Sequence, residues 1–379
     1  MTPTPLSVST PGNAQGDAAP IRLGTRASAL ATTQSGLVAR RLEELTGRPV
    51  ELVHIRTEGD VKTGSLASLG GTGVFVTALR EALLDGRCDV AVHSLKDLPT
   101  APAPGLTFVT PEREDPRDAL CARDGLTLAT LRHNARVGTG SPRRAAQIRA
   151  ARPDLDVVDI RGNVGTRLNR ALGPDADLDA VVLAYAGLAR LGRTEVISEV
   201  LDVDVVAPAP GQGALAVEVR TADIVSDPST GSGQRAGAAS RVPDPSTRSG
   251  QHPSTGSVHG LAEAIHLLDH RPTRLAVLAE RSVLARLEAG CAAPVGAHAT
   301  VLPGTVEGVG SVLRLRAVVA AVDGSEQMSR SAETRLSPDV APETVDDAAR
   351  ALGRSVAEHL LADGAERLAP LSATVPEKA

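Results

Sequence analysis

The stretch RVGTGSPRRAAQIRAARPDLDVVDIRGNVGTRLNRAL, residues 136–172, decides the fold of this chain. Ser141 and Pro142 have the form of a helix N-cap followed by proline at the first helical position, and Asn163 is a second plausible cap. Strands and helices that alternate in this way predict a parallel sheet covered by helices, with ligands bound beyond the C-terminal ends of the strands. The expected elements are a strand at 136–138, a helix from 142, a strand at 157–160 and a helix at 164–172.

The same alternation continues on both sides of this stretch and predicts an α/β protein. Further strands are expected at 21–23, 50–55, 89–92, 180–184 and 214–219, and helices at 29–45 and 74–83. Beyond residue 260 the pattern changes to that of a smaller α+β unit. Its expected elements are a helical stretch at 261–287, a strand at 313–322 that ends in an Asp323-Gly324 turn, and a helix at 342–361.

Three domains are expected, which a chain of 379 residues is long enough to form. The Pro/Gly link APAPGQG (207–213) leads back to an apolar segment of the first domain. The imperfect repeats DPSTGSGQ (227–234) and DPSTRSGQ (244–251) cannot bury a core. The expected boundaries are a disordered tail at 1–20, a first α/β domain at 21–114 plus 212–222, a second α/β domain at 115–211, a disordered insertion at 223–259 and an α+β domain at 260–379.

Composition excludes several classes of function. Hydrophobic residues make up 42% and charged residues 22% of the chain, as in ordinary globular proteins. A stretch of about 18 uncharged apolar residues, which a membrane span requires, does not occur. The net charge of −5 and the three aromatic residues argue against nucleic-acid binding by a basic surface or by base stacking.

Cysteine usage and the N-terminal segment indicate a reducing cytoplasm. Cys88, Cys121 and Cys291 are too few and too scattered for a disulfide framework. Cysteine and histidine never occur together at zinc-ligand spacing, so we expect no metal. The first 20 residues lack the basic and apolar regions of a signal peptide.

An arginine cluster is the most informative chemical feature. Arginine accounts for 37 of the 40 basic residues, which codon bias can explain, but codon bias does not explain where the arginines lie. A helix dipole disfavours cations in the first turn, so Arg143 and Arg144 indicate that an anion occupies that turn. Arg161 and Arg167 flank a second strand-to-helix turn of the same kind. The other arginines between 143 and 170 suit an exposed helix face: Arg149, Arg152 and Arg170.

Three further positions each allow two interpretations. Arg26 follows the first strand and is either a surface residue or an anion ligand. Lys96 and Asp97 end a strand, where they form either a local ion pair or an acid/base group among cations. Cys291 lies among small residues after a helix, and a lone cysteine of this kind is usually a buried structural thiol.

These segments together resemble the porphobilinogen deaminase (hydroxymethylbilane synthase) family over about residues 21–220 and 260–365. Many ordered blocks carry the resemblance, and no single block would be specific. The blocks are LGTRASAL (23–30), TEGD (57–60), GGTGVFV (70–76), DVAVHSLKDLPT (89–100), EREDPRDAL (112–120), VGTGSPRR (137–144), DIRGNVGTRL (159–168), AGLARLG (186–192), APGQGALAVE (209–218) and LEAGCAAPVG (287–296).

The resemblance implies a transferase that joins four porphobilinogen molecules, with loss of ammonia, into linear hydroxymethylbilane. It implies that Cys291 carries a dipyrromethane cofactor through a thioether, which replaces the structural interpretation of that thiol. It implies that Asp97 assists loss of ammonia and stabilises an azafulvene cation. Matches to residues that hold acetate and propionate groups are Arg26, Ser28, Lys96, Thr139, Ser141, Arg143, Arg144, Arg161, Arg167 and Arg190.

The implied fold has two domains that resemble periplasmic binding proteins, with a cleft between them, and a C-terminal domain that carries the cysteine. The loop at 57–73 would cover the cleft, and Phe75 would lie near the cofactor. Thr72, Gly140 and Ala29 depart from residues common in the family. A monomer is expected, without nucleic-acid or membrane partners. The rival interpretation, a non-catalytic polycarboxylate-binding protein of the same fold, would need the arginines but not Asp97 or Cys291.

Overall fold

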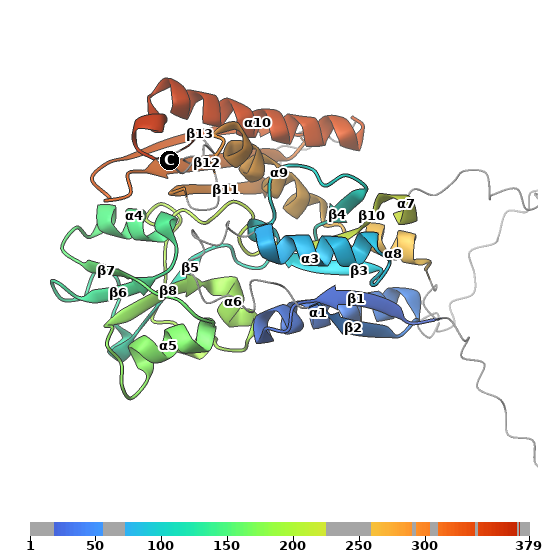
Figure 1. Cartoon of the computed structure of the whole chain (residues 1–379). Helices are drawn as coiled ribbons and strands as arrows, with labels where there is room; N and C mark the ends of the chain where they lie inside the picture. The colour runs from blue at the N-terminus through green and yellow to red at the C-terminus, as the bar shows by residue number, and fades with distance from the viewer. Residues whose placement is uncertain are drawn as a thin grey trace, which may run out of the picture.

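The computed structural model describes residues 19–55, 73–224, 259–289, 293–303, 310–337, 340–369 and 371. Cys291, Thr72, most of the loop expected at 57–73, the repeats and the side chain of Phe75 lie outside the described residues. Figure 1 shows two α/β units, blue and green, side by side, with the orange and red C-terminal unit above them. In the described ranges, no helix is both long and apolar enough to cross a membrane.

The first sheet has five strands in the order β2-β1-β3-β10-β4. Strands β2, β1 and β3 are parallel, whereas β10 lies antiparallel between β3 and β4. Helices α1 (Ala29–Thr46) and α3 (Gly73–Leu84) pack on this sheet. The strands are β1 Ile21–Thr25, β2 Val50–His54, β3 Val90–Ser94, β4 Leu106–Val109 and β10 Leu215–Arg220.

The second sheet repeats this arrangement in the order β7-β6-β8-β5-β9. Here β7, β6 and β8 are parallel, and β5 lies antiparallel between β8 and β9. Helices α4 (Pro142–Ala151) and α5 (Val164–Leu172) follow β6 and β7. The strands are β5 Asp118–Ala122, β6 Arg136–Thr139, β7 Asp156–Asp159, β8 Ala180–Ala184 and β9 Glu199–Val200.

The expected α/β class is confirmed, but the expectation of purely parallel sheets is wrong for one position in each sheet. The chain passes from the first unit to the second between β4 and β5, and returns between β9 and β10. The strand that follows each passage enters its sheet from the other unit. These strands are β5 and β10. Two parallel neighbours must be joined by a crossover helix, but β5 and β10 arrive without one, and they lie antiparallel.

The C-terminal unit places two long helices over a three-stranded antiparallel sheet of order β11-β12-β13. The helical stretch expected at 261–287 is two helices, because the chain turns at Asp269 and His270, just before Pro272. The elements of this unit are α9 Arg271–Arg286, β11 Val295–Leu302, β12 Val312–Ala320, β13 Gln327–Arg335 and α10 Pro342–Ala362. The helix before them, α8 Leu261–Leu268, packs on α1 and β4 of the first unit.

The local signals that predicted the central stretch are confirmed. Ser28 Oγ accepts a hydrogen bond from the Ala31 amide at 3.3 Å at the start of α1. Ser141 and Asn163 cap α4 and α5 in the same way. Aliphatic side chains fill the cores, and each fully buried leucine contributes about 1.5–3 kcal/mol. Fully buried examples from the three units are Leu23, Leu120 and Leu315.

Candidate functional site

The turn that ends β3 places a lysine and an aspartate where the two α/β units meet. Residues Leu95–Asp97 form a single 3₁₀ turn, η1. Lys96 Nζ donates a hydrogen bond to Gln212 Oε1 at 3.3 Å. Gln212 lies in the segment that returns the chain to the first unit, so the lysine reaches across to the crossing between the units.

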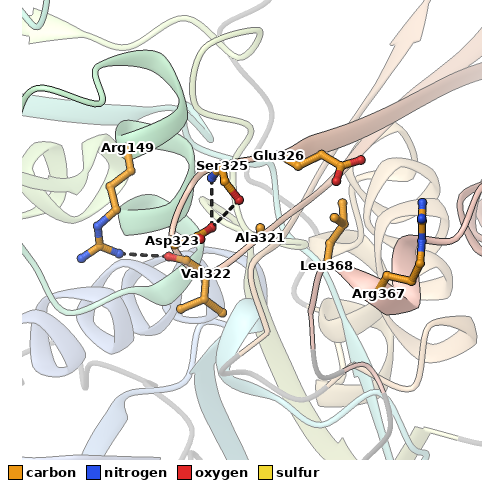
Figure 2. Close-up of a pocket in the computed structure, with 8 residues that line it drawn as sticks. All are labelled: Arg149, Ala321, Val322, Asp323, Ser325, Glu326, Arg367 and Leu368. Carbon is orange, nitrogen blue, oxygen red and sulfur yellow. Dashed lines mark hydrogen bonds between the residues drawn. The ribbon is translucent and has the colours of Figure 1, made fainter.

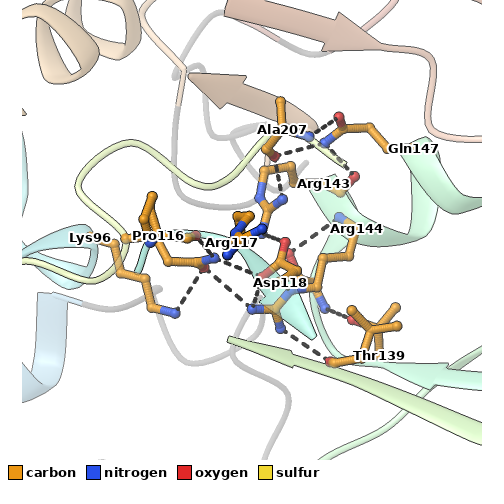
Figure 3. Close-up of polar contacts among 12 residues, drawn as sticks. Lys96, Pro116, Arg117, Asp118, Thr139, Arg143, Arg144, Gln147 and Ala207 are labelled. Atoms are coloured by element: carbon orange, nitrogen blue, oxygen red, sulfur yellow. Dashed lines mark hydrogen bonds and ion pairs between the residues drawn. The ribbon is translucent and has the colours of Figure 1, made fainter. Parts of the chain in front are cut away.

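Asp118, the first residue of β5, forms ion pairs with both arginines of the first turn of α4 (Figure 3). Arg143 Nη2 donates to Asp118 Oδ2 at 2.8 Å, and Arg144 Nε donates to Asp118 Oδ1 at 3.0 Å. All three side chains are buried. A carboxylate of the protein itself therefore binds these two arginines, and a ligand anion at this helix turn stays a prediction. Sequence reasoning missed the carboxylate because Asp118 is 25 residues away along the chain.

Gln212 connects the lysine of the first unit with the arginines of the second. Its Oε1 accepts from Lys96 Nζ and from Arg144 Nη2, both at 3.3 Å. Its Nε2 donates to Asp118 Oδ1 and to the Pro116 carbonyl oxygen, both at 2.7 Å. Sequence reasoning assigned no role to Gln212. The available signal was a polar residue between two glycines at the chain crossing.

The third unit holds Gln212 in place. Glu280 of α9 is fully buried, and its Oε2 accepts from the Gly211 amide at 2.7 Å. Arg113 donates to both Glu280 oxygens at 2.7 and 3.0 Å, and its Nε donates to the Gln212 carbonyl oxygen at 2.7 Å. Helix α9 therefore binds both segments that connect the two α/β units. All three units together determine the position of the Gln212 amide.

Cations outnumber carboxylates around this junction. Burial and the charge of Arg144 lower the pKa of Lys96 to about 8, although Asp97 and Asp118 act in the opposite direction. Burial opposes ionisation of Asp118, but the charges of Arg143 and Arg144 outweigh it and lower the pKa of Asp118 to about 2. Burial is the main cause of the lowered lysine pKa, and the charge of Arg144 adds to it.

Arg143 has a spare donor in this positive region. The residue is 3% exposed, and its Nε has no hydrogen-bond partner among the described residues. The other guanidinium nitrogens bind the Ala207 carbonyl oxygen at 2.5 Å and Asp118. A buried N–H without a partner costs about 1–3 kcal/mol, which an acidic ligand would recover. The site therefore fits a group that carries several carboxylates.

The remaining predicted ligands are arranged around this centre. Thr139 is buried at the end of β6, and its Oγ1 accepts from the Ser141 amide at 3.3 Å. Burial, and next the charge of Arg144, lower the pKa of Arg167, which donates to the Gly162 carbonyl oxygen at 2.8 Å. Arg161 is half exposed and pairs with Asp159 at 3.4 Å.

The last three predicted ligands lie where the two units face each other. Arg190 ends α6 (Tyr185–Arg190) and donates to the Gly213 carbonyl oxygen at 2.6 Å, next to Gln212. Arg26 and Ser28 precede α1, whose N-terminal part contacts α6. The structure thus brings Lys96, Arg143 and Arg144 into one cluster, with Arg167 and Arg190 next to it.

The packing of the backbone around position 140 leaves room only for glycine. A Cβ atom at this position would lie 2.5 Å from the Ile160 carbonyl oxygen, closer than real Cβ contacts allow. A serine here would require β6 or the segment after β7 to shift. The close approach of these two segments therefore requires glycine at this position.

A separate hollow lies between α4 and the turn that joins β12 to β13 (Figure 2). It measures about 730 Å³, but several of its polar groups already have partners within the chain. Arg149 Nη1 donates to the Val322 carbonyl oxygen at 3.0 Å, and Asp323 accepts from the amide and the hydroxyl of Ser325. This is a junction between units, where Arg149 binds carbonyl oxygens, and its groups do not converge on a ligand.

Two of the three thiols are unsuited to covalent chemistry. Burial raises the pKa of Cys121 to about 12 and also raises that of Cys88. A thiolate is the reactive form of cysteine, so these two thiols are inert at neutral pH. Among the described residues, no group of three or more His, Cys, Asp or Glu side chains could hold a metal ion.

Polyanion binding should weaken as the pH rises above about 8. Lys96 carries its charge below its pKa of about 8 and loses it above that value. An anionic ligand raises the lysine pKa, so ligand and proton bind together, and a pKa that rises by about one on binding corresponds to a tenfold change in affinity. In Cys291→Ser protein, calorimetry with benzenehexacarboxylate should show about tenfold weaker binding at pH 9.5 than at pH 7. Lys96→Met should remove this pH dependence, and an unchanged slope in that variant would contradict the assignment.

Two family models match the chain. One is described as "Porphobilinogen deaminase, dipyromethane cofactor binding domain" and matches residues 21–226, and the other is described as "Porphobilinogen deaminase, C-terminal domain" and matches residues 274–362. Porphobilinogen deaminase from Micrococcus luteus is 51% identical over 92% of this chain and 94% of its own length. The enzymes from Cutibacterium acnes and Thermobifida fusca are also 51% identical, over 93% and 92% of this chain and 98% and 95% of their own lengths.

Proposed function

The chain belongs to the porphobilinogen deaminase family, and on this premise we propose how its residues perform the reaction. It is a transferase that joins four porphobilinogen molecules, with loss of ammonia, into linear hydroxymethylbilane. Its cofactor is dipyrromethane. The relatives are deaminases, which supports this activity over non-catalytic binding of polycarboxylates.

The observation that carries the mechanism is the cluster of Lys96, Arg143 and Arg144 at the junction of the two α/β units. Every pyrrole of the cofactor and substrate brings two carboxylates, and each charge-assisted hydrogen bond contributes about 1.5–3 kcal/mol. Arg143, Arg144 and Lys96 would hold the cofactor's acidic side chains from the buried side. Substrate side chains would bind at the borders of the cluster, to Arg26, Ser28, Thr139, Ser141, Arg161, Arg167 and Arg190.

Cys291 is the proposed attachment point. The raised pKa values of Cys88 and Cys121 leave it as the thiol suited to forming a thioether. When bound, the dipyrromethane would supply a primer anchored at Cys291, and new pyrrole units would be added at its free end. The protein's own residues would bind the carboxylates of this primer.

Asp97 is the proposed catalytic residue. It is partly buried beside Lys96, in a region where cations prevail. Loss of ammonia from porphobilinogen leaves positive charge on the substrate's pyrrole, and a carboxylate fixed in a partly buried site stabilises that charge. Lys96 and the arginines bind carboxylates and cannot serve this purpose, because they carry the wrong sign.

The domain boundaries expected from the sequence are kept as part of this proposal: 21–114 plus 212–222, 115–211 and 260–379. The strand composition of the three sheets supports them. We also propose a cytoplasmic monomer, for which the scattered cysteines and the family resemblance are the support.

The mass of the intact purified chain, followed by peptide mapping around Cys291, tests this function. We expect an added mass that matches two linked pyrroles, located on Cys291 and absent from Cys291→Ser. Cys88→Ser and Cys121→Ser are matched controls that should keep the addition. A Cys291 that stays unmodified after incubation with porphobilinogen would overturn the proposal and favour a non-catalytic polycarboxylate-binding protein.

A further inference from the structure

An arginine of the C-terminal unit binds the backbone of the turn that carries Asp97. Arg281 extends from α9, and its Nη1 donates to the carbonyl oxygens of Leu95 at 3.2 Å and Leu98 at 3.0 Å. Its Nη2 donates to the Pro99 carbonyl oxygen at 2.5 Å. The three acceptors enclose Lys96 and Asp97 in the chain, so a single guanidinium spans the whole turn.

The turn itself supplies a donor to only one of these carbonyl groups. A 3₁₀ turn of three residues closes with one internal bond, here from the Leu98 amide to the Leu95 carbonyl oxygen at 3.1 Å. Carbonyl groups at the end of a helix need donors from outside it. The planar fork of an arginine can serve several such acceptors at once, whereas the ammonium of a lysine is a compact point donor.

The same face of α9 also packs on the turn through apolar contacts. Val277, one helical turn before Arg281, is 1% exposed and belongs to a buried cluster with Leu95 and Leu98. A hydrophobic contact and a set of hydrogen bonds therefore fix η1 to α9 independently. This helix ends at Arg286, five residues before Cys291 in the sequence.

We propose that Arg281 is a positioning residue for Asp97, which sets the catalytic turn against the unit that bears the cofactor cysteine. The inference rests on the proposed role of Asp97. Arg281 acts through the backbone: it holds the orientation of the turn, and the turn directs the carboxylate toward the substrate. A displacement of about 1 Å at a catalytic group can cost on the order of 10²-fold in rate.

Turnover in cofactor-loaded variants is the first readout. Arg281→Met should lower kcat about 10- to 100-fold with KM within about threefold, and Arg281→Lys should recover part of the loss. The control is Arg286→Met on the same helix, whose half-exposed pair with Glu358 lies 3.3 Å apart and away from η1. That control should stay within twofold of the wild type. A wild-type chain that does not turn over porphobilinogen would refute the proposed function. The role of Arg281 is tested separately, by the ratio of kcat in the variant to kcat in the wild type.

Hydrogen–deuterium exchange on cofactor-free protein is the second readout, and it does not depend on activity. Peptides that cover residues 93–99 should exchange at least tenfold faster in Arg281→Met than in Arg286→Met, with unchanged exchange in β6 and β8. An unchanged kcat per loaded molecule would overturn the proposal. So would equal exchange at residues 93–99 in the two variants, because Arg281 would then not hold the turn.

Discussion

Asp97→Asn is expected to lower turnover of porphobilinogen by about 10²–10⁴-fold while the cofactor stays attached to protein that was supplied with it. Asparagine keeps the shape of the side chain and removes its negative charge, so binding of carboxylates by the surrounding cations should persist. Initial rates of porphobilinogen consumption measure the effect, and the intact mass reports cofactor content.

Asp85→Asn is the matched control for this variant. Asp85 is an exposed acid of the same unit that pairs with Arg87 at 3.4 Å. Its replacement should leave turnover unchanged. Asp97 raises the pKa of Lys96, so Asp97→Asn should also move that pKa further below about 8, which NMR of the lysine side chain can follow. Normal turnover in Asp97→Asn would remove Asp97 from the mechanism.

Asp118→Asn is expected to lower the free energy of unfolding by about 3–5 kcal/mol. Asp118 is fully buried, and its loss would leave Arg143 and Arg144 as uncompensated buried cations. Because the pKa of Asp118 is lowered to about 2, its ionised form stabilises the fold above pH 4, and this contribution is lost as the pH falls from about 4 to 2. Urea unfolding at pH 7 and pH 3 measures both effects.

The control for Asp118 is Asp159→Asn. Asp159 pairs with Arg161 at 3.4 Å, and both side chains are about half exposed or more, so the expected change is below about 1 kcal/mol. A loss below about 1 kcal/mol in Asp118→Asn at pH 7 would show that other groups neutralise the two arginines.

The buried arginines near Asp118 have two functions, one in folding stability and one in ligand binding. Arg143 and Arg144 would repel each other and the dipole of α4 without an acid beside them. Asp118 removes most of that cost, and it leaves Arg143 Nε and the Lys96 ammonium with unused capacity toward an anion. The protein is thereby stable before the acidic ligand arrives and still attracts it.

Residues close in the sequence determined much of the fold. Ser141-Pro142 and Asn163 start α4 and α5 because cap and helix are adjacent, and β3 and β8 contain short, continuous apolar runs. The short strands β4 and β9 were missed because their side chains are only partly buried and carry weak patterns. The break before Pro272 was missed because helical spacing continues across it.

By itself, the sequence determined the α/β class, the helix starts and which stretches carry the chemistry, because periodicity, capping and motif spacing act between near neighbours. Only the tertiary structure decided the antiparallel strands, the pairing of Asp118 with Arg143, the bridging by Gln212 and the hold of Arg281 on the turn of Asp97. Arg281 is more than 180 residues from that turn, and Gln212 is 116 residues from Lys96. Contacts across such separations leave no local pattern, since folding alone brings their partners within hydrogen-bond distance.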